Sequence, residues 1–80
     1  MNTVRLSDAD NVVTATRPLE TGEDGALQLI PRGHKLATAD IPKGAPVIKY
    51  AQVIGFAAED ITKGAHVHTH NLEFRNVDTA

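Results

Sequence analysis

Cysteine, tryptophan and an excess of positive charge are all missing from this 80-residue chain. Without cysteine there is no disulfide framework of the kind that small secreted domains need, and a reducing, cytoplasmic location is favoured. Tyr50, Phe56 and Phe74 are the only aromatic residues, so the core has to be built from Val, Ile, Leu and Ala. A chain this short buries only about 60 to 65% of its surface. We therefore expect thin stability, helped by a partner chain or by homo-oligomerisation.

Charge and hydropathy argue against two classes of partner. The formal net charge is −2, so the chain has no basic field to attract nucleic acid or an anionic membrane surface. No run approaches the roughly 20 apolar residues that span a bilayer. The polar segment 7–11 stands where a secretory signal would need apolar residues. We expect a soluble protein without nucleic-acid or membrane partners.

Common catalytic motifs are also absent. The sequence has no Gly-rich phosphate loop, no Ser-His-Asp order typical of a hydrolase, and no cysteine that could ligate a metal. An independent hydrolase is therefore not indicated.

The chain contains an internal repeat. Segment 37–47 recurs as 57–67, and a fainter copy spans 15–22. In each copy an aliphatic residue precedes a glycine by three positions, a spacing suited to a short turn whose last residue takes a positive φ. Asp40 and Asp60 are expected to accept hydrogen bonds from the backbone amides that follow them, as helix-capping residues do. The paired residues are Leu19 and Gly22, Ile41 and Gly44, and Ile61 and Gly64.

Short β-rich runs lie between these turns. Because they are separated by Gly and Pro, they predict a compact all-β barrel or clip, with helix confined to single turns. We expect one domain over residues 1–80, with its core at about 10–72 and a loose tail at 73–80. The expected strands are 12–15, 26–30, 35–37, 47–50, 53–57 and 67–69.

Three of the four histidines alternate near the C-terminus, at His66, His68 and His70. In an extended strand their side chains share one face. Imidazole titrates near neutrality and is the commonest transition-metal ligand, so this row favours metal binding or proton transfer. Three ligands on one strand rarely complete a metal site, so further groups must come from elsewhere. The alternative is a row of solvent-facing side chains with a structural role.

A second candidate is the corner at His34 and Lys35. Pro31 fixes one backbone dihedral and Gly33 permits an unusual one. The side chains of His34 and Lys35 are therefore presented at the edge of a rigid turn. A histidine beside a lysine suits a general acid or base next to an anion anchor. The alternative is an ordinary surface pair. Lys43 and Lys63, in the repeated turns, are expected to be solvated.

Several motifs in fixed order resemble the SAF-type N-terminal domain of the altronate/galactarate dehydratase family. The resemblance covers about residues 10 to 72, nearly the whole chain. The Gly-His-Lys and His-x-His-x-His-Asn elements are its most specific parts. The motifs are Asp10-Asn11-Val12, Ile30-Pro31-x-Gly33-His34-Lys35-x-Ala37, Asp40-Ile41-x-Lys43-Gly44, Val47-Ile48-Lys49-Tyr50, Val53-Ile54-Gly55 and His66-Val67-His68-Thr69-His70-Asn71.

The resemblance implies a β-clip fold like that of type III antifreeze protein. It also implies a hydro-lyase that dehydrates an aldonate or aldarate to a 2-keto-3-deoxy acid. Such a domain is a small subunit, or an N-terminal domain, that completes an active site with a large catalytic chain and is inactive alone. The implied cofactor is a divalent metal, Fe²⁺ or Mn²⁺, shared with or supplied by the large chain.

Residue by residue, the resemblance implies that His34 and Lys35 are catalytic. Lys49 and Tyr50, at the end of the expected strand 47–50, are the substrate-binding candidates, the alternative being that Tyr50 is an ordinary tyrosine at the edge of the core. His66, His68 and His70 are the metal ligands or proton carriers. The chain departs from the family pattern at Ala51, where glycine is usual, and at Phe56, where a basic residue or tyrosine is common.

Two alternatives stay open. Small subunits of (2R)-sulfolactate sulfo-lyases carry much the same motifs. A non-catalytic SAF module that binds a carbohydrate or a protein would use the same fold, since fold alone fixes no function.

Overall fold

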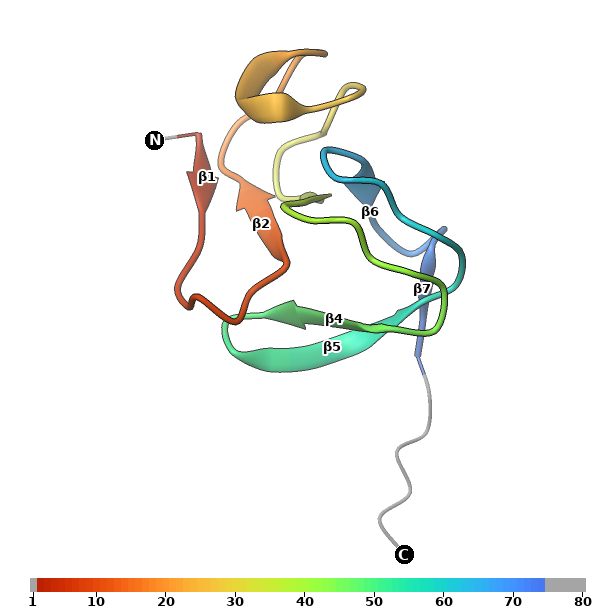
Figure 1. Ribbon diagram of the computed structural model, residues 1–80. Coiled ribbons are helices and arrows are strands. Elements are labelled where there is room, and N and C mark those ends of the chain that lie inside the picture. The colour runs from red at the N-terminus through yellow and green to blue at the C-terminus, as the bar shows by residue number, and fades with distance from the viewer. Residues whose placement is uncertain (1, 75–80) are drawn as a thin grey trace, which may run out of the picture.

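The structure, a computed structural model, describes residues 2–74 and is all-β, as expected (Figure 1). Its helical content in that range is one 3₁₀ turn, η1 at Glu23–Gly25. No helix in the described part of the chain is long and apolar enough to cross a membrane. The strands are β1 (Thr3–Val4), β2 (Val12–Ala15), β3 (Lys35–Ala37), β4 (Pro46–Lys49), β5 (Gln52–Ala57), β6 (His66–Val67) and β7 (Leu72–Glu73).

The strands form two antiparallel sheets. One has the order β1-β2-β3-β6 and the other the order β4-β5-β7. In the first sheet Lys35 is aligned with Thr14 on β2 and with Val67 on β6. The β4–β5 hairpin runs across the lower end of the first sheet in Figure 1. This arrangement brings the corner before β3 next to the histidines of β6.

Apolar side chains are buried on both faces of the first sheet, in two clusters. Side chains alternate along a strand, so Val12 enters one cluster while Val13 and Ala15 enter the other. The first cluster fills the space between the sheets, and segment 19–30 covers the second. The first comprises Val12, Ala37, Ile41, Val47, Ala57, Ile61, Val67 and Leu72, and the second Val13, Ala15, Leu19, Ala26, Ile30 and Leu36.

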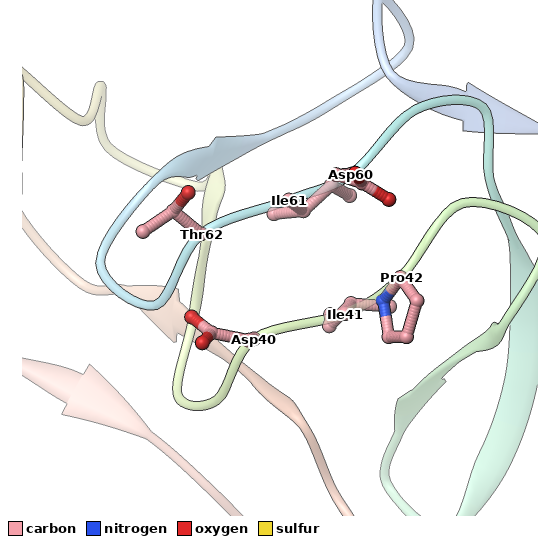
Figure 2. Close-up of a pocket in the computed structure, with 6 residues that line it drawn as sticks. All are labelled: Asp40, Ile41, Pro42, Asp60, Ile61 and Thr62. Atoms are coloured by element: carbon pink, nitrogen blue, oxygen red, sulfur yellow. The ribbon is translucent and has the colours of Figure 1, made fainter.

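The repeated turns are present, and their glycines adopt the expected positive φ, at 95° for Gly22, 86° for Gly44 and 89° for Gly64. The two clearest copies lie side by side, joined by a β-bridge between Ile41 and Ile61 (Figure 2). The hollow on the surface between them, lined by the residues in Figure 2, contains no histidine.

The prediction that Asp40 and Asp60 cap their own turns is wrong. Asp40 accepts a hydrogen bond of 2.8 Å from the amide of Lys63, and Asp60 accepts one of 2.8 Å from the amide of Lys43. Each carboxylate therefore caps the other copy, because the antiparallel bridge places the two turns head to tail.

Other expected elements and boundaries are also corrected. Segment 26–30 is irregular and not a strand. Only its two ends are buried, and Leu27 and Leu29 are exposed. The strand expected at 67–69 stops at Val67. Glu73, placed in the loose tail, pairs with Phe56 in β7, and β1 adds a strand before residue 10. The rest of the expected tail, from residue 75, lies outside the described residues.

Candidate active site

All four histidines gather where β3 meets β6. His34 precedes β3, His66 lies in β6, and His68 and His70 lie in the turn that follows. Leu36 is aligned with His66 and Lys35 with Val67, so the antiparallel register continues to place His34 opposite His68. Alternation then puts His34 and His66 on the same face of the sheet. The sequence placed His66 and His68 together, and the structure adds His34 to them.

The imidazole rings are stacked. The rings of His34 and His68 are 3.8 Å apart between centroids and 13° from parallel, and those of His34 and His66 are 5.0 Å apart and 18° from parallel. His34 Nδ1 lies 2.8 Å from His66 Nε2. At that distance one nitrogen donates a proton and the other accepts it, so the two rings share a proton.

Asn71 closes the turn that follows β6. Its buried side chain accepts a hydrogen bond of 3.0 Å from the amide of His68 and donates one of 2.9 Å to the carbonyl of His66. The chain therefore turns back, and the ring of His70 lies 5.0 Å from that of His66, tilted by 37°. The expected extended row of three histidines is thus wrong beyond Val67. Sequence reasoning named Asn71 in a motif but assigned it no role, although asparagine is a common turn residue.

Burial and the neighbouring bases favour the neutral form of two of these imidazoles, those of His66 and His68, by lowering their pKa. Burial is the largest cause that lowers the pKa of His66, followed by the neighbouring His70, His34, His68 and Lys35. Burial likewise lowers the pKa of His68, with His34, Lys35 and His70 adding to the effect. A neutral imidazole has a lone pair free to accept a proton or bind a metal.

Lys35 supplies positive charge beside His66 and His68, and Lys49, at the end of β4, lies near Lys35. Burial lowers the pKa of Lys35, and the nearby charge of Lys49 lowers it further. Lys49 Nζ lies 4.9 Å from the centre of the Tyr50 ring, and Tyr50 is 38% exposed. Within residues 2–74 neither lysine has an ion-pair partner. Lys49 thus lies near both Lys35 and Tyr50, and the two lysines supply positive charge that an anion can neutralise.

Three of the histidines fit a metal site. One ligand nitrogen from each of His34, His66 and His68 lies within 4.8 Å of the other two. His68 Nδ1 is buried and has no hydrogen-bond partner among the described residues, so a ligand atom is available. Imidazole suits Fe, Zn, Cu and Ni, and three protein ligands leave an open position for substrate. His70, one of the three ligands expected from the sequence, is not in this set.

Comparison with known proteins supports the resemblance. Residues 1–75 match the family described as the altronate/galactarate dehydratase SAF domain. Altronate dehydratase from Escherichia coli (strain K12) is 42% identical over 79 residues, which cover 89% of this chain and 16% of that protein. The sulfo-lyase relative, (2R)-sulfolactate sulfo-lyase subunit alpha from Paracoccus pantotrophus, is 50% identical over 44 residues, covering 55% of this chain and 66% of that subunit.

Altronate dehydratase from Bacillus subtilis (strain 168) is 34% identical over 88% of this chain. The chain spans only 16% of the length of each of these two dehydratases. The match therefore concerns one small domain of much longer enzymes. With the family matched along nearly all of its length, the chain belongs to the SAF domain family of the altronate and galactarate dehydratases.

Proposed function

We propose that this chain is the small SAF part of a sugar-acid dehydratase and completes an active site with a large catalytic polypeptide. The observation that carries the proposal is the convergence of His34, His66 and His68 on one point beside Lys35. Support comes from relatives named altronate dehydratase, of which the chain spans 16%. A domain of this size cannot supply every group that dehydration needs, so the remainder belongs to the larger partner.

The metal is Fe²⁺ or Mn²⁺, held by His34, His66 and His68 and completed by groups of the large chain. When bound, it supplies Lewis acidity that stabilises the negative charge of an enediolate. The unpartnered Nδ1 of His68 and the neutral state of His66 suit these residues as ligands. His70, beside His66, carries protons between the site and the solvent.

The remaining residues of the site handle the sugar acid. Elimination of water needs a base that takes the proton next to the carboxylate and an acid that protonates the departing hydroxyl. Lys35, half-buried next to the histidines, takes part in this proton transfer. Lys49 and Tyr50 bind the substrate carboxylate, since an ammonium group and a phenolic hydroxyl both donate hydrogen bonds.

The test is a chimera in which this chain replaces the matching segment of the altronate dehydratase from Escherichia coli. We expect the chimera to dehydrate altronate, and His34→Ala and Lys35→Ala to lower kcat at least about a hundredfold, the usual scale for losing a positioned catalytic group. Lys43→Ala is the matched control, since Lys43 is an exposed turn lysine. Iron content separates the roles, because His34→Ala loses the metal whereas Lys35→Ala retains it. Full activity of His34→Ala would contradict the proposal.

The second candidate is the small subunit of a (2R)-sulfolactate sulfo-lyase. It is favoured by the 48% and 50% identity to two subunits of that name over 44 residues. Sulfite release from sulfolactate, measured with the chain and a large sulfo-lyase subunit, distinguishes it from the dehydratase. If neither acid is turned over and histidine substitutions change nothing, a non-catalytic carbohydrate- or protein-binding module is the better account.

A further inference from the structure

The loop between β1 and β2 reaches down to the turn of the β4–β5 hairpin (Figure 1). That turn follows Lys49 and contains Tyr50, the proposed substrate-binding residues. The loop ends in Asp10 and Asn11, which opened the series of motifs in the sequence but have no part in the site described above. Both side chains accept hydrogen bonds from the backbone of the hairpin.

The hairpin turn is in a conformation that its residues disfavour. Tyr50 has a φ of 54° and Ala51 a φ of 63°. Two successive positive φ values define the mirror-image turn of a two-residue hairpin, which normally takes glycine, asparagine or aspartate. Neither Tyr50 nor Ala51 is one of these residues. The turn therefore needs support from outside the hairpin.

Asp10 supplies that support on one side. It is 3% exposed, and its Oδ1 accepts a hydrogen bond of 2.7 Å from the amide of Ala51. Its Oδ2 accepts a bond of 3.3 Å from the amide of Leu6. Burial by itself would raise the pKa of this carboxyl, but hydrogen bonds from the amides of Ala51, Tyr50, Leu6 and Ser7 lower it. The carboxylate thus ties the turn to the loop.

Asn11 holds the first arm of the hairpin. Its Oδ1 accepts a hydrogen bond of 2.7 Å from the amide of Ile48, and its Nδ2 donates one of 3.0 Å to the carbonyl of Pro46. Its own amide donates to the carbonyl of Ile48 at 3.1 Å. The pairing of β4 with β5 shifts register between Val47 and Ile48. Asn11 therefore fixes the strand where its own ladder is irregular.

The loop is itself held in shape. The Arg5 guanidinium donates to the carbonyls of Ser7 at 3.1 Å, Asp8 at 3.1 Å and Asp10 at 3.2 Å. Because these bonds close the loop on itself, Asp10 and Asn11 project from a fixed base.

We infer that Asp10 and Asn11 are positioning residues, which hold the hairpin turn in the conformation that presents Lys49 and Tyr50 to the substrate. The geometric part stands on the contacts above. The functional part rests on the proposed role of Lys49 and Tyr50.

The geometric part is tested by the fluorescence of Tyr50, because the chain has one tyrosine and no tryptophan. In Asp10→Asn an NH₂ group replaces one of the two accepting oxygens, and we expect acrylamide quenching of Tyr50 to rise at least about twofold in the folded chain. Asp60→Asn is the matched control, since Asp60 also accepts a hydrogen bond from a backbone amide but lies in a repeated turn and not at the hairpin. Its Tyr50 quenching should stay unchanged. Equal quenching in wild type and folded Asp10→Asn, or an equal rise in both variants, would overturn the inference.

If Asp10→Asn does not fold, the comparison is made in an Ala51→Gly background, where positive φ is adopted without strain. There Asp10→Asn is measured against Ala51→Gly alone. The same two outcomes decide, because residue 10 still has one accepting oxygen fewer.

The functional part is tested in the dehydratase chimera. A positioning role at a binding group predicts that Asp10→Asn raises KM for altronate about tenfold with kcat within about twofold, since uniform binding is lost. A merely destabilising substitution such as Asp60→Asn lowers the amount of active enzyme and leaves KM unchanged. A Tyr50 signal that moves while KM stays constant would overturn the positioning role and remove Lys49 and Tyr50 from substrate binding. If the chimera is inactive even with the wild-type Asp10, that result contradicts the proposed function and not the geometric part of the inference.

Discussion

Gly64 offers the sharpest test of how the fold positions β6, the strand that begins with His66. It lies two residues before His66, its amide donates to the carbonyl of Ala37 at 2.8 Å, and its carbonyl accepts from the amide of Leu27 at 2.9 Å. A Cβ added at Gly64 would lie 2.3 Å from the carbonyl oxygen of Gly25 and 3.1 Å from Leu27 Cγ. The first contact is with backbone, so no side-chain rotation can relieve it.

The cost of Gly64→Ala has three parts. The positive φ of 89° costs alanine about 1 to 2 kcal/mol. This cost is partly offset, by about 0.4 to 1 kcal/mol, because alanine lowers the conformational entropy of the unfolded chain. Moving the carbonyl of Gly25 away by about 1 Å, to ordinary contact, adds overpacking strain of about 1 to 3 kcal/mol. Weakening the two hydrogen bonds of Gly64 adds about 1 to 2 kcal/mol. Together these parts give an expected loss of about 2 to 7 kcal/mol.

Gly22→Ala is the matched control, because Gly22 has a φ of 95° but nothing within 4 Å of the added Cβ. We expect it to cost about 1 kcal/mol or less. Urea unfolding followed by circular dichroism measures both. With a slope of about 1 kcal/mol per molar for a small domain, Gly64→Ala should lower the midpoint by at least about 1 M more than Gly22→Ala. Where the loss exceeds the stability of the wild-type chain, Gly64→Ala should be unfolded without urea. Equal midpoints for the two variants would refute the packing of Gly64 against Gly25.

Three further outcomes are expected. Ala51→Gly should raise the free energy of unfolding by about 0.5 to 1 kcal/mol, because Ala51 has a φ of 63°. The control Ala39→Gly, at an exposed position without positive φ, should lower the free energy of unfolding. A lower free energy of unfolding in both variants would argue against the strained turn. The pKa values of His66 and His68 are lowered by folding, so the unfolded chain takes up protons first as pH falls below about 6.5. The urea midpoint should therefore fall between pH 7.5 and 5.5, and a constant or rising midpoint would contradict their burial as neutral groups. In the dehydratase chimera Tyr50→Phe should raise KM for altronate severalfold, as expected for one lost hydrogen bond, and an unchanged KM would exclude its hydroxyl from binding.

Local patterns predicted those parts of the fold in which neighbouring residues decide the outcome. The glycine turns followed from spacing, because positive φ is a property of the residue itself. Segment 26–30 was misread as a strand because a run of apolar residues does not show which of them the tertiary structure buries. Ala26 and Ile30 are buried in the second core cluster, while the leucines between them are exposed.

The site shows the same division. Alternation grouped His66 with His68, but nothing local joins them to His34, which is 32 residues from His66 in sequence. Only the pairing of β3 with β6 brings that ring into the cluster. The exchange of capping partners between Asp40 and Asp60 was invisible for the same reason, since it depends on how the two repeats face each other.

Titration of the 80-residue chain with Co²⁺, a spectroscopic probe for the proposed metal, tests the central claim most directly. We predict one ion bound per chain, with an affinity at least about tenfold lower in each of His34→Ala, His66→Ala and His68→Ala, and little changed in His70→Ala. No uptake by the folded chain, or uptake that the first three substitutions leave unaltered, would contradict a histidine metal centre in this domain.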